Sequence, residues 1–308
     1  MIKTLLPFAI LLLLAVAPVG AAEVPPLVDA KWLSANLERA DLRVLDIQEP
    51  ADYARFHVPG AVNAPYARWR TSAKDPKAPS MLPPVAQLED LLGGLGIGNT
   101  DTVVIVPTGR GASDLAAAAR VFWTFKVLGH DPVAVLDGGL VAWAEARQPV
   151  ESGNTRAQRV AYTAKVDASQ LVTAEDAKAR LQAGAEFVDA RSEGEFVGLY
   201  TGAKGERPGT IPGSDHLPHD WIAVDGSARM RSPEALKALF AARGVGTAGE
   251  QVHFCHSGNR AALTWFAAYA VMGNEQARLY DGSTMEWARR ADLPLVQHIQ
   301  LCEPGASC

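Results

Sequence analysis

The amino-acid sequence predicts an α/β protein of two tandem domains, each with a parallel β-sheet flanked by helices. Short apolar runs typical of strands alternate with helical stretches, and the same order of elements occurs twice in the 308 residues. Asp46 and Asp189, which end matching strands, lie 143 residues apart, and Asp137 and Asp281 lie 144 residues apart. Two separate features that recur at nearly one spacing indicate a duplicated domain.

Each copy has the same elements in the same order. A short apolar strand ends in Asp at 44–46 and again at 187–189. A Pro-Gly turn, a helix, a β-rich run (102–106 or 251–254) and a long helix rich in alanine and aromatic residues follow, and a last strand then ends in Asp-Gly. Alternation of strands and helices is typical of parallel βαβ units, so each copy is expected to form its own layered sheet.

The first residues have the pattern of a secretory signal peptide. Lys3 precedes an apolar run at 5–16, and small residues follow up to Ala22. A membrane anchor is the alternative, but the run is short against the roughly 20 residues that a membrane span needs. We expect residues 1–22 to be cleaved and the mature protein to be periplasmic or secreted, without membrane attachment.

Charge and composition indicate the class of partner and the domain boundaries. The net charge is −5 and no basic block occurs, so nucleic acid is not expected as a partner. A polar segment with Gly153 and Asn154 separates the copies and is interpreted as a linker. The expected division is a first domain at 23–150, a linker at 151–162, a second domain at 163–300 and a cysteine-containing tail at 301–308.

The chain has three cysteines, Cys255, Cys302 and Cys308, which is too few for a disulfide-built scaffold. One hypothesis pairs the two tail cysteines in an oxidising compartment. Cys255 would then remain as the free thiol.

Cys255 stands where a strand ends and a helix begins, in the segment 255–260, called here the Cys255 loop. Ligands of parallel sheets bind at this edge, and the backbone N–H groups of such a turn hold anions. A thiolate there is stabilised, so its pKa is expected to fall below the usual value of about 8.5. Gly258 permits a tight turn, and Arg260 adds a charge suited to oxyanions. The alternative is a buried core cysteine, which would not require Gly and Arg within five positions.

The first copy lacks these reactive groups. Its position that matches Cys255 falls at about Pro107 or Thr108, and Gln48 stands where the second copy has Arg191. The first copy is therefore expected to be structural and to help wall the cleft between the domains.

The segment CHSGNR resembles the Cys-x-x-Gly-x-Arg active-site loop of the rhodanese family of sulfurtransferases. Other motifs of that family have counterparts here: VDAR at 188–191, IPGS at 211–214 and YDGSTMEW at 280–287, with HVPGAVNAP at 57–65 and LDGGLVAW at 136–143 in the first copy. The tandem arrangement resembles the thiosulfate and mercaptopyruvate sulfurtransferases, in which only the C-terminal domain carries the cysteine.

The resemblance implies two rhodanese-like domains and a sulfurtransferase that needs no cofactor or metal. Cys255 would take sulfur from thiosulfate as a persulfide and pass it to cyanide or to a thiol. Arg191 would contact the anionic donor, and Ser283 would either bond the sulfur or order the loop. The other residues expected to contact substrate belong to the Cys255 loop: His256, Ser257, Gly258, Asn259 and Arg260. His256 would lend positive charge or simply face solvent, and both alternatives stay open.

The same motifs leave three alternative functions. Mercaptopyruvate enzymes place extra arginines after the Asp-Ala-Arg strand, whereas Glu193 and Glu195 follow here, so thiosulfate is favoured. An exported carrier that hands persulfide sulfur to a partner protein is a further alternative. Phosphatases of related fold have five residues between Cys and Arg, whereas four separate Cys255 from Arg260, which argues against phosphate. One family motif differs in this chain: Thr210 stands where the family usually has a histidine before Ile-Pro-Gly, so this chain has no histidine to fill a role at that position.

Overall fold

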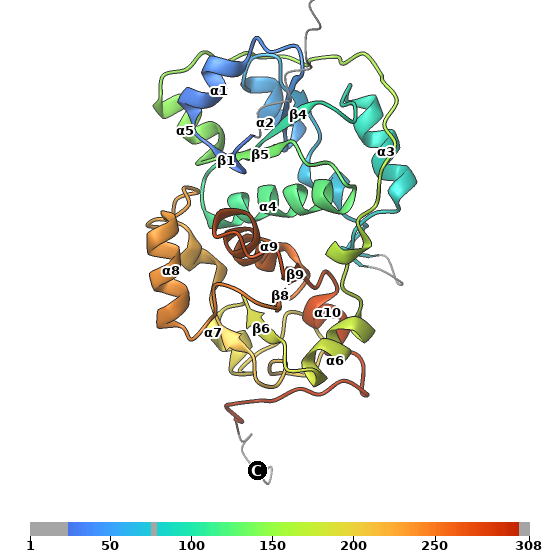
Figure 1. The fold of residues 1–308 in the computed structure, drawn as a ribbon, viewed down its shortest axis with the longest axis vertical. Helices are drawn as coiled ribbons and strands as arrows, with labels where there is room; N and C mark the ends of the chain where they lie inside the picture. The colour runs from blue at the N-terminus through green and yellow to red at the C-terminus, as the bar shows by residue number, and fades with distance from the viewer. Residues whose placement is uncertain (1–23, 75–78, 302–308) are drawn as a thin grey trace, which may run out of the picture.

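The computed structural model describes residues 24–74 and 79–301. These residues form two α/β domains stacked along the longest axis of the molecule (Figure 1). The predicted signal peptide at 1–22 and the tail cysteines Cys302 and Cys308 lie outside the described residues. Within the described part, no helix combines the length and the apolar character that a membrane crossing requires.

The N-terminal domain contains a five-stranded sheet in which every paired strand is parallel. Its strands at 102–106 (TVVIV) and 133–136 (VAVL) are buried at every position, as is typical of parallel strands covered by helices on both faces. Helices α1 (Ala30–Asn36), α2 (Pro50–Arg55) and α5 (Gly139–Glu145) cover one face, while α3 (Val85–Gly94) and α4 (Ala112–Val127) cover the other. The strand order is β1 (Leu27–Val28), β5 (Val133–Leu136), β4 (Thr102–Val106), β2 (Leu42–Asp46) and β3 (Val62–Asn63).

The C-terminal domain repeats this plan with a four-stranded parallel sheet. An isolated parallel bridge between Leu171 and Leu279 occupies the place that β1 has in the first domain. The prediction of a duplicated α/β domain is therefore confirmed. The strand order is β7 (Asp215–His216), β6 (Glu186–Asp189), β8 (Gln251–Phe254) and β9 (Ala277–Leu279), and the helices are α6 (Ala174–Gln182), α7 (Glu193–Phe196), α8 (Pro233–Ala242), α9 (Asn259–Phe266) and α10 (Ser283–Trp287).

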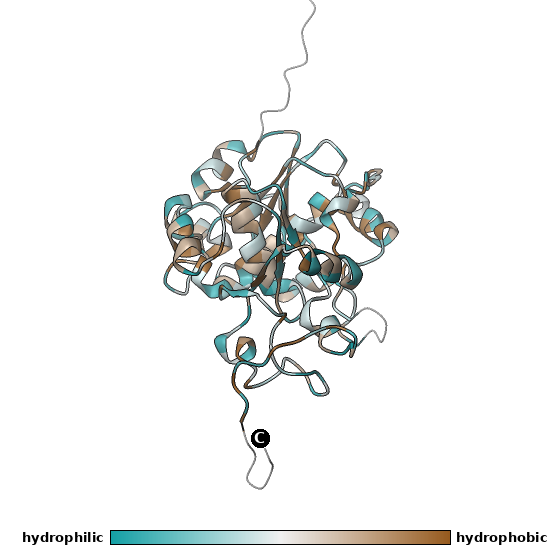
Figure 2. Cartoon of the chain, turned by 60° about the horizontal axis from the view of Figure 1, so that its bottom comes forward, coloured by the Kyte–Doolittle hydropathy of each residue, from teal (hydrophilic) through white to brown (hydrophobic). Residues whose placement is uncertain are grey.

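The two domains meet along their long helices, because α4 packs against α9 between the two sheets (Figure 1). The ring of Phe122 meets that of Phe266 edge-on, with 4.8 Å between the centroids, and residues of both helices belong to one hydrophobic core. Burial of each such aromatic side chain stabilises the fold by about 1.5–3 kcal/mol, so this shared core holds the two domains together. Hydrophobic residues accordingly concentrate at the centre of the molecule (Figure 2).

The segment expected to be a linker, 151–162, runs in extended form along the N-terminal domain. The backbone N–H of Val160 donates to the carbonyl of Gly93 at 3.0 Å. The same course continues to Asp167, whose N–H donates to the carbonyl of Val127 at 2.9 Å. The connection therefore lies on the first domain until the short 3₁₀-helix Ala168–Gln170 leads into the second.

Candidate active site at the Cys255 loop

Cys255 directly follows β8 at the carboxyl edge of the second sheet and is 1% exposed. The strand registers identify its counterpart in the first domain. Phe254 pairs with Asp189 as Val106 pairs with Asp46. The position equivalent to Cys255 is therefore Pro107, one of the two positions predicted, and the first domain has no thiol there.

Gly258 makes the turn from the loop into α9. Its φ of +73° lies in the left-handed region, where side chains are strained. A Cβ at this position would lie 2.8 Å from Oδ1 of Asp281 and 2.9 Å from Nη1 of Arg120. Both conformation and space therefore require glycine here.

The hydroxyl of Ser283 organises the Cys255 loop from beneath. It accepts hydrogen bonds from the backbone N–H groups of Cys255 and Gly258, each at 3.1 Å, and donates to the carbonyl of Tyr280 at 2.8 Å. Thr284 adds two donors, its backbone N–H and its hydroxyl, to the carbonyl of Cys255 at 3.0 Å. Of the two roles expected for Ser283, this geometry favours ordering of the loop.

Four backbone N–H groups of the loop remain available for a ligand. Those of His256, Ser257, Asn259 and Arg260 have no hydrogen-bond partner within the described residues. A cluster of unsatisfied N–H groups at the start of a helix attracts an anion. The loop therefore has the donors to stabilise a thiolate or a persulfide on Cys255.

Arg260 is fixed by a carboxylate on α7. Its Nη1 and Nη2 donate to the two carboxylate oxygens of Glu195 at 2.7 and 2.8 Å. Burial alone would raise the pKa of Glu195, but the hydrogen bonds and charge of Arg260 outweigh it and hold that pKa at about 2. Burial works to lower the pKa of Arg260, and the bond to Glu195 and the charge of Cys255 raise it. Arg260 is thus a permanent cation within electrostatic range of the sulfur.

His256 is held by a second carboxylate. Its Nε2 lies 3.1 Å from both carboxylate oxygens of Glu206, which also bonds Arg289 at 3.3 Å. The ring packs on Gly202, where a Cβ would lie only 2.1 Å from Cδ2 of the histidine. The side chain of His256 is 17% exposed, so it is partly buried against Glu206 and still reaches solvent, and both expected roles stay open.

Arg191 lies at the end of β6, but its guanidinium is directed at the protein. Nε and Nη2 donate to the carboxylate of Asp189, with the shortest distance 2.6 Å, and Nη2 also donates to the carbonyl of Gly209 at 2.9 Å. The hydroxyl of Thr210 donates to the same carboxylate at 2.7 Å. In this structure Arg191 therefore braces the strand end, and its contact with a donor stays a prediction.

The first domain reaches the Cys255 loop directly, which sequence reasoning missed. The phenol of Tyr66 donates to Oδ1 of Asn259 at 2.5 Å, and Arg70 donates to the carbonyl of Ser257 at 2.6 Å. Arg120 of α4 lies beneath the loop. The one signal available was an arginine within the apolar, alanine-rich run of α4.

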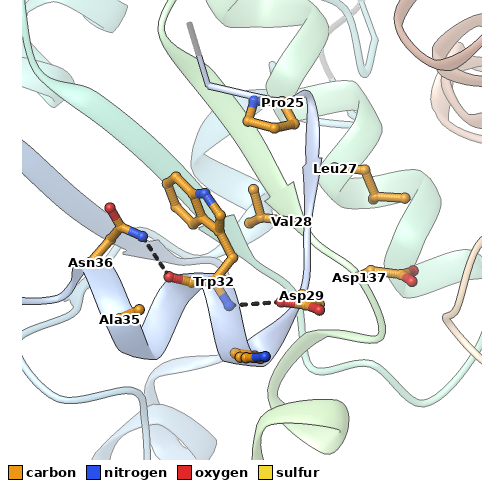
Figure 3. Close-up of a pocket in the computed structure, with 9 residues that line it drawn as sticks. Pro25, Leu27, Val28, Asp29, Trp32, Ala35, Asn36 and Asp137 are labelled. Carbon is orange, nitrogen blue, oxygen red and sulfur yellow. Dashed lines mark hydrogen bonds between the residues drawn. The ribbon is translucent and has the colours of Figure 1, made fainter. Parts of the chain in front are cut away.

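Two cavities differ in their relation to the loop. One of about 510 Å³ lies beside Arg260, where residues 110–114 of the first domain face Ser192 and His219 of the second. Burial and the charge of Arg260 lower the pKa of His219 to about 4, so the imidazole of His219 is neutral at pH 7. The other, of about 530 Å³, lies against β1 and α1 around Trp32 and has no residue of the loop (Figure 3).

Comparison with known proteins supplies the family. The model of the rhodanese-like domain matches this chain twice, at residues 29–146 and 173–290. The chain belongs to the rhodanese family. Thiosulfate sulfurtransferase of Mus musculus is 34% identical over 283 residues, which cover 86% of this chain and 92% of the relative. The 3-mercaptopyruvate sulfurtransferase of Homo sapiens is 33% identical over 272 residues, which cover 86% of this chain and 85% of the relative.

Solved structures show the same rhodanese fold. SseA of Escherichia coli, described as a 3-mercaptopyruvate sulfotransferase, superposes with a TM-score of 0.73 at 23% identity, covering 84% of this chain and 99% of SseA. YnjE superposes with a TM-score of 0.74 at 24% identity, covering 89% of this chain and 69% of YnjE. The expected tandem rhodanese architecture is thus confirmed, and the protein is a sulfurtransferase.

Proposed function

We propose that this rhodanese moves sulfane sulfur from thiosulfate to cyanide or to a small thiol through a persulfide on Cys255. The observation that carries the proposal is the set of four free N–H groups around a cysteine at a strand end, with the cation Arg260 beside it. These are the groups that an anionic donor and a negatively charged sulfur intermediate require.

The two half-reactions balance without any further reagent. The Cys255 thiolate attacks the outer sulfur of thiosulfate, the sulfur–sulfur bond of the donor breaks, and sulfite leaves with the electron pair. The persulfide anion then rests among the loop N–H groups. Cyanide attacks its terminal sulfur and leaves as thiocyanate, which returns the thiolate. With a thiol acceptor, the acceptor sulfur makes the same attack and its proton is released.

Thiosulfate is proposed as the donor because the residues after Arg191 differ from those of mercaptopyruvate enzymes. After Arg191 the chain continues with Glu193 and Glu195 on α7. Mercaptopyruvate enzymes place extra arginines there to bind the donor carboxylate, and this chain has none in α7. The mercaptopyruvate reaction and the role of a persulfide carrier are the outcomes to be separated from it by experiment.

Export is part of the proposal. Residues 1–22 carry the charged start, apolar middle and small-residue end of a cleaved signal, so the mature enzyme would work in the periplasm or outside the cell. Sequencing of the mature N-terminus from the native host tests this. A mature chain that still begins at Met1 would refute cleavage.

Intact mass of the purified protein before and after thiosulfate tests the mechanism. We expect a gain of one sulfur atom, about 32 mass units, that disappears on addition of cyanide and is absent in Cys255→Ser. A gain with mercaptopyruvate alone would change the donor. A gain with thiosulfate that cyanide and small thiols leave in place, but that a protein thiol removes, would support the carrier function. No gain with either donor would refute Cys255 as the sulfur carrier.

A further inference from the structure

The first domain has no cysteine at the position equivalent to Cys255, yet it holds the Cys255 loop of the second domain by two hydrogen bonds. Tyr66 lies in the 3₁₀-helix Tyr66–Trp69 and donates its phenolic proton to Asn259 at 2.5 Å. Arg70 follows this helix and donates from Nη2 to the carbonyl of Ser257 at 2.6 Å. Both acceptor residues, Asn259 and Ser257, are among the four loop residues whose backbone N–H groups have no partner among the described residues.

The two donors are themselves held in place. Nε and Nη2 of Arg70 donate to the carbonyl of Ser80 at 3.0 and 2.9 Å, and its guanidinium lies 5.7 Å from the centre of the Tyr66 ring. Two positions after Ser80, Leu82 donates its backbone N–H to Oδ2 of Asp281 at 2.7 Å. The first domain thus forms hydrogen bonds both to the Cys255 loop and to Asp281, which follows β9.

The bond from Arg70 fixes one particular peptide unit of the loop. In a trans peptide the carbonyl and the N–H point in opposite directions. The carbonyl of Ser257 is bonded by Arg70, and the N–H of the same unit, on Gly258, is bonded to Ser283 at 3.1 Å. The plane of this peptide is therefore set from both domains, and it sets the direction of the free N–H groups on either side.

Electrostatics agree with this placement. Burial raises the pKa of Tyr66, and the charges of Asp281 and Cys255 raise it further, while that of Arg70 opposes them. The phenol therefore stays neutral and remains a donor to Asn259.

We propose that Tyr66 and Arg70 are positioning residues of the sulfurtransferase reaction, through which the first domain holds the anion-binding N–H groups of the Cys255 loop in their productive arrangement. This inference rests on the proposed function. It gives the first domain a task in catalysis beyond walling the cleft.

The test compares Arg70→Ala, Arg70→Lys and Tyr66→Phe with a matched control, Arg229→Ala. Arg229 pairs with Glu145 across the same domain boundary at 2.6 Å, is half exposed and does not touch the loop. The readouts are the pH midpoint of Cys255 alkylation by iodoacetamide, the single-turnover rate of persulfide formation, and thermal unfolding.

We expect Arg70→Ala to raise the alkylation midpoint by about one pH unit and to slow persulfide formation about tenfold or more, because the free N–H groups lose their direction. Arg70→Lys should recover part of both effects, and Tyr66→Phe should show a smaller change of the same sign. Arg229→Ala should leave both readouts as in the wild type. Equal effects in Arg70→Ala and Arg229→Ala, or an unchanged alkylation midpoint in Arg70→Ala with a folded protein, would overturn the inference.

The alkylation midpoint needs no sulfur donor, so it separates this inference from the proposed function. If the wild type forms no persulfide but Arg70→Ala still shifts the midpoint, the proposed function fails, and what stands is that the first domain holds the N–H groups of the Cys255 loop. If the wild type forms a persulfide and no variant of Tyr66 or Arg70 alters midpoint or rate, the positioning role fails alone.

Discussion

Arg120 and Asp281 form an ion pair across the domain boundary, directly beneath the Cys255 loop. Nη1 of Arg120 lies 2.5 Å from Oδ1 of Asp281, and the two residues are 0% and 5% exposed. The guanidinium also lies 4.3 Å from the centre of the Trp123 ring, and none of its three nitrogens has a hydrogen-bond partner among the described residues, so the contact with Asp281 is an ion pair only. A cation buried to this degree depends on its one carboxylate, because desolvation of an unpaired charge is costly.

Substitution of Asp281→Asn should therefore destabilise the protein by about 3–5 kcal/mol, since it leaves the charge of Arg120 buried without compensation. Asparagine still offers an oxygen to the backbone N–H of Leu82, so the loss comes from the charge. Urea unfolding measures the effect. The double variant Arg120→Leu/Asp281→Asn should recover part of the stability, and a single variant within about 1 kcal/mol of the wild type would contradict the ion pair's role.

The pair of Glu195 and Arg260 predicts a definite pH dependence of stability. The pKa of Glu195 is lowered from 4.5 to about 2 in the folded protein. Its contribution is therefore fully present above pH 4.5 and is lost as the pH falls toward 2. Glu195→Gln should destabilise by about 2 kcal/mol at pH 6–8, a value reduced for the partial exposure of the pair. The difference between variant and wild type should shrink below pH 4.5 in urea unfolding, and a constant difference down to pH 3 would contradict the assignment.

Local patterns predicted most of the scaffold. The strands that end at Asp46 and Asp189, and the loop between β8 and α9, are short segments whose residue types determine a strand end or a helix start. The duplicated order of these patterns was enough to predict two parallel sheets. The loop's own residues were found for the same reason, because Cys255, Gly258 and Arg260 lie within six positions.

The partners of those residues depend on how distant segments dock, and local sequence patterns do not reveal that. Tyr66 and Asn259 are 193 positions apart, and Arg70 and Ser257 are 187 apart. Glu206, the partner of His256, lies 50 positions earlier in the chain and was not predicted for the same reason.

Ser283 should be needed for the geometry of the loop. Its hydroxyl accepts from two loop N–H groups, and its φ of +50° is unusual for a residue with a side chain. Ser283→Ala should slow persulfide formation about 10- to 100-fold, because two buried donors lose their acceptor. Ser283→Gly separates conformation from hydrogen bonding, since it relieves the backbone but supplies no acceptor. It should be as slow as Ser283→Ala and more stable; a wild-type rate in either variant would refute the role.

Gly202→Ala should disturb the reaction by displacing His256. The added Cβ would meet the imidazole ring at 2.1 Å, so the ring must leave its place or the segment around Gly202 must move. Either change breaks the contact with Glu206 and shifts a polar group beside the nucleophile. We expect a fall of about tenfold in the rate of sulfur transfer to cyanide, measured in single turnover from the preformed persulfide. Gly98→Ala is the matched control, because its Cβ would only touch Asp101 at an ordinary 3.6 Å. Equal rates in the two variants would show that His256 and its carboxylate do not affect the transfer.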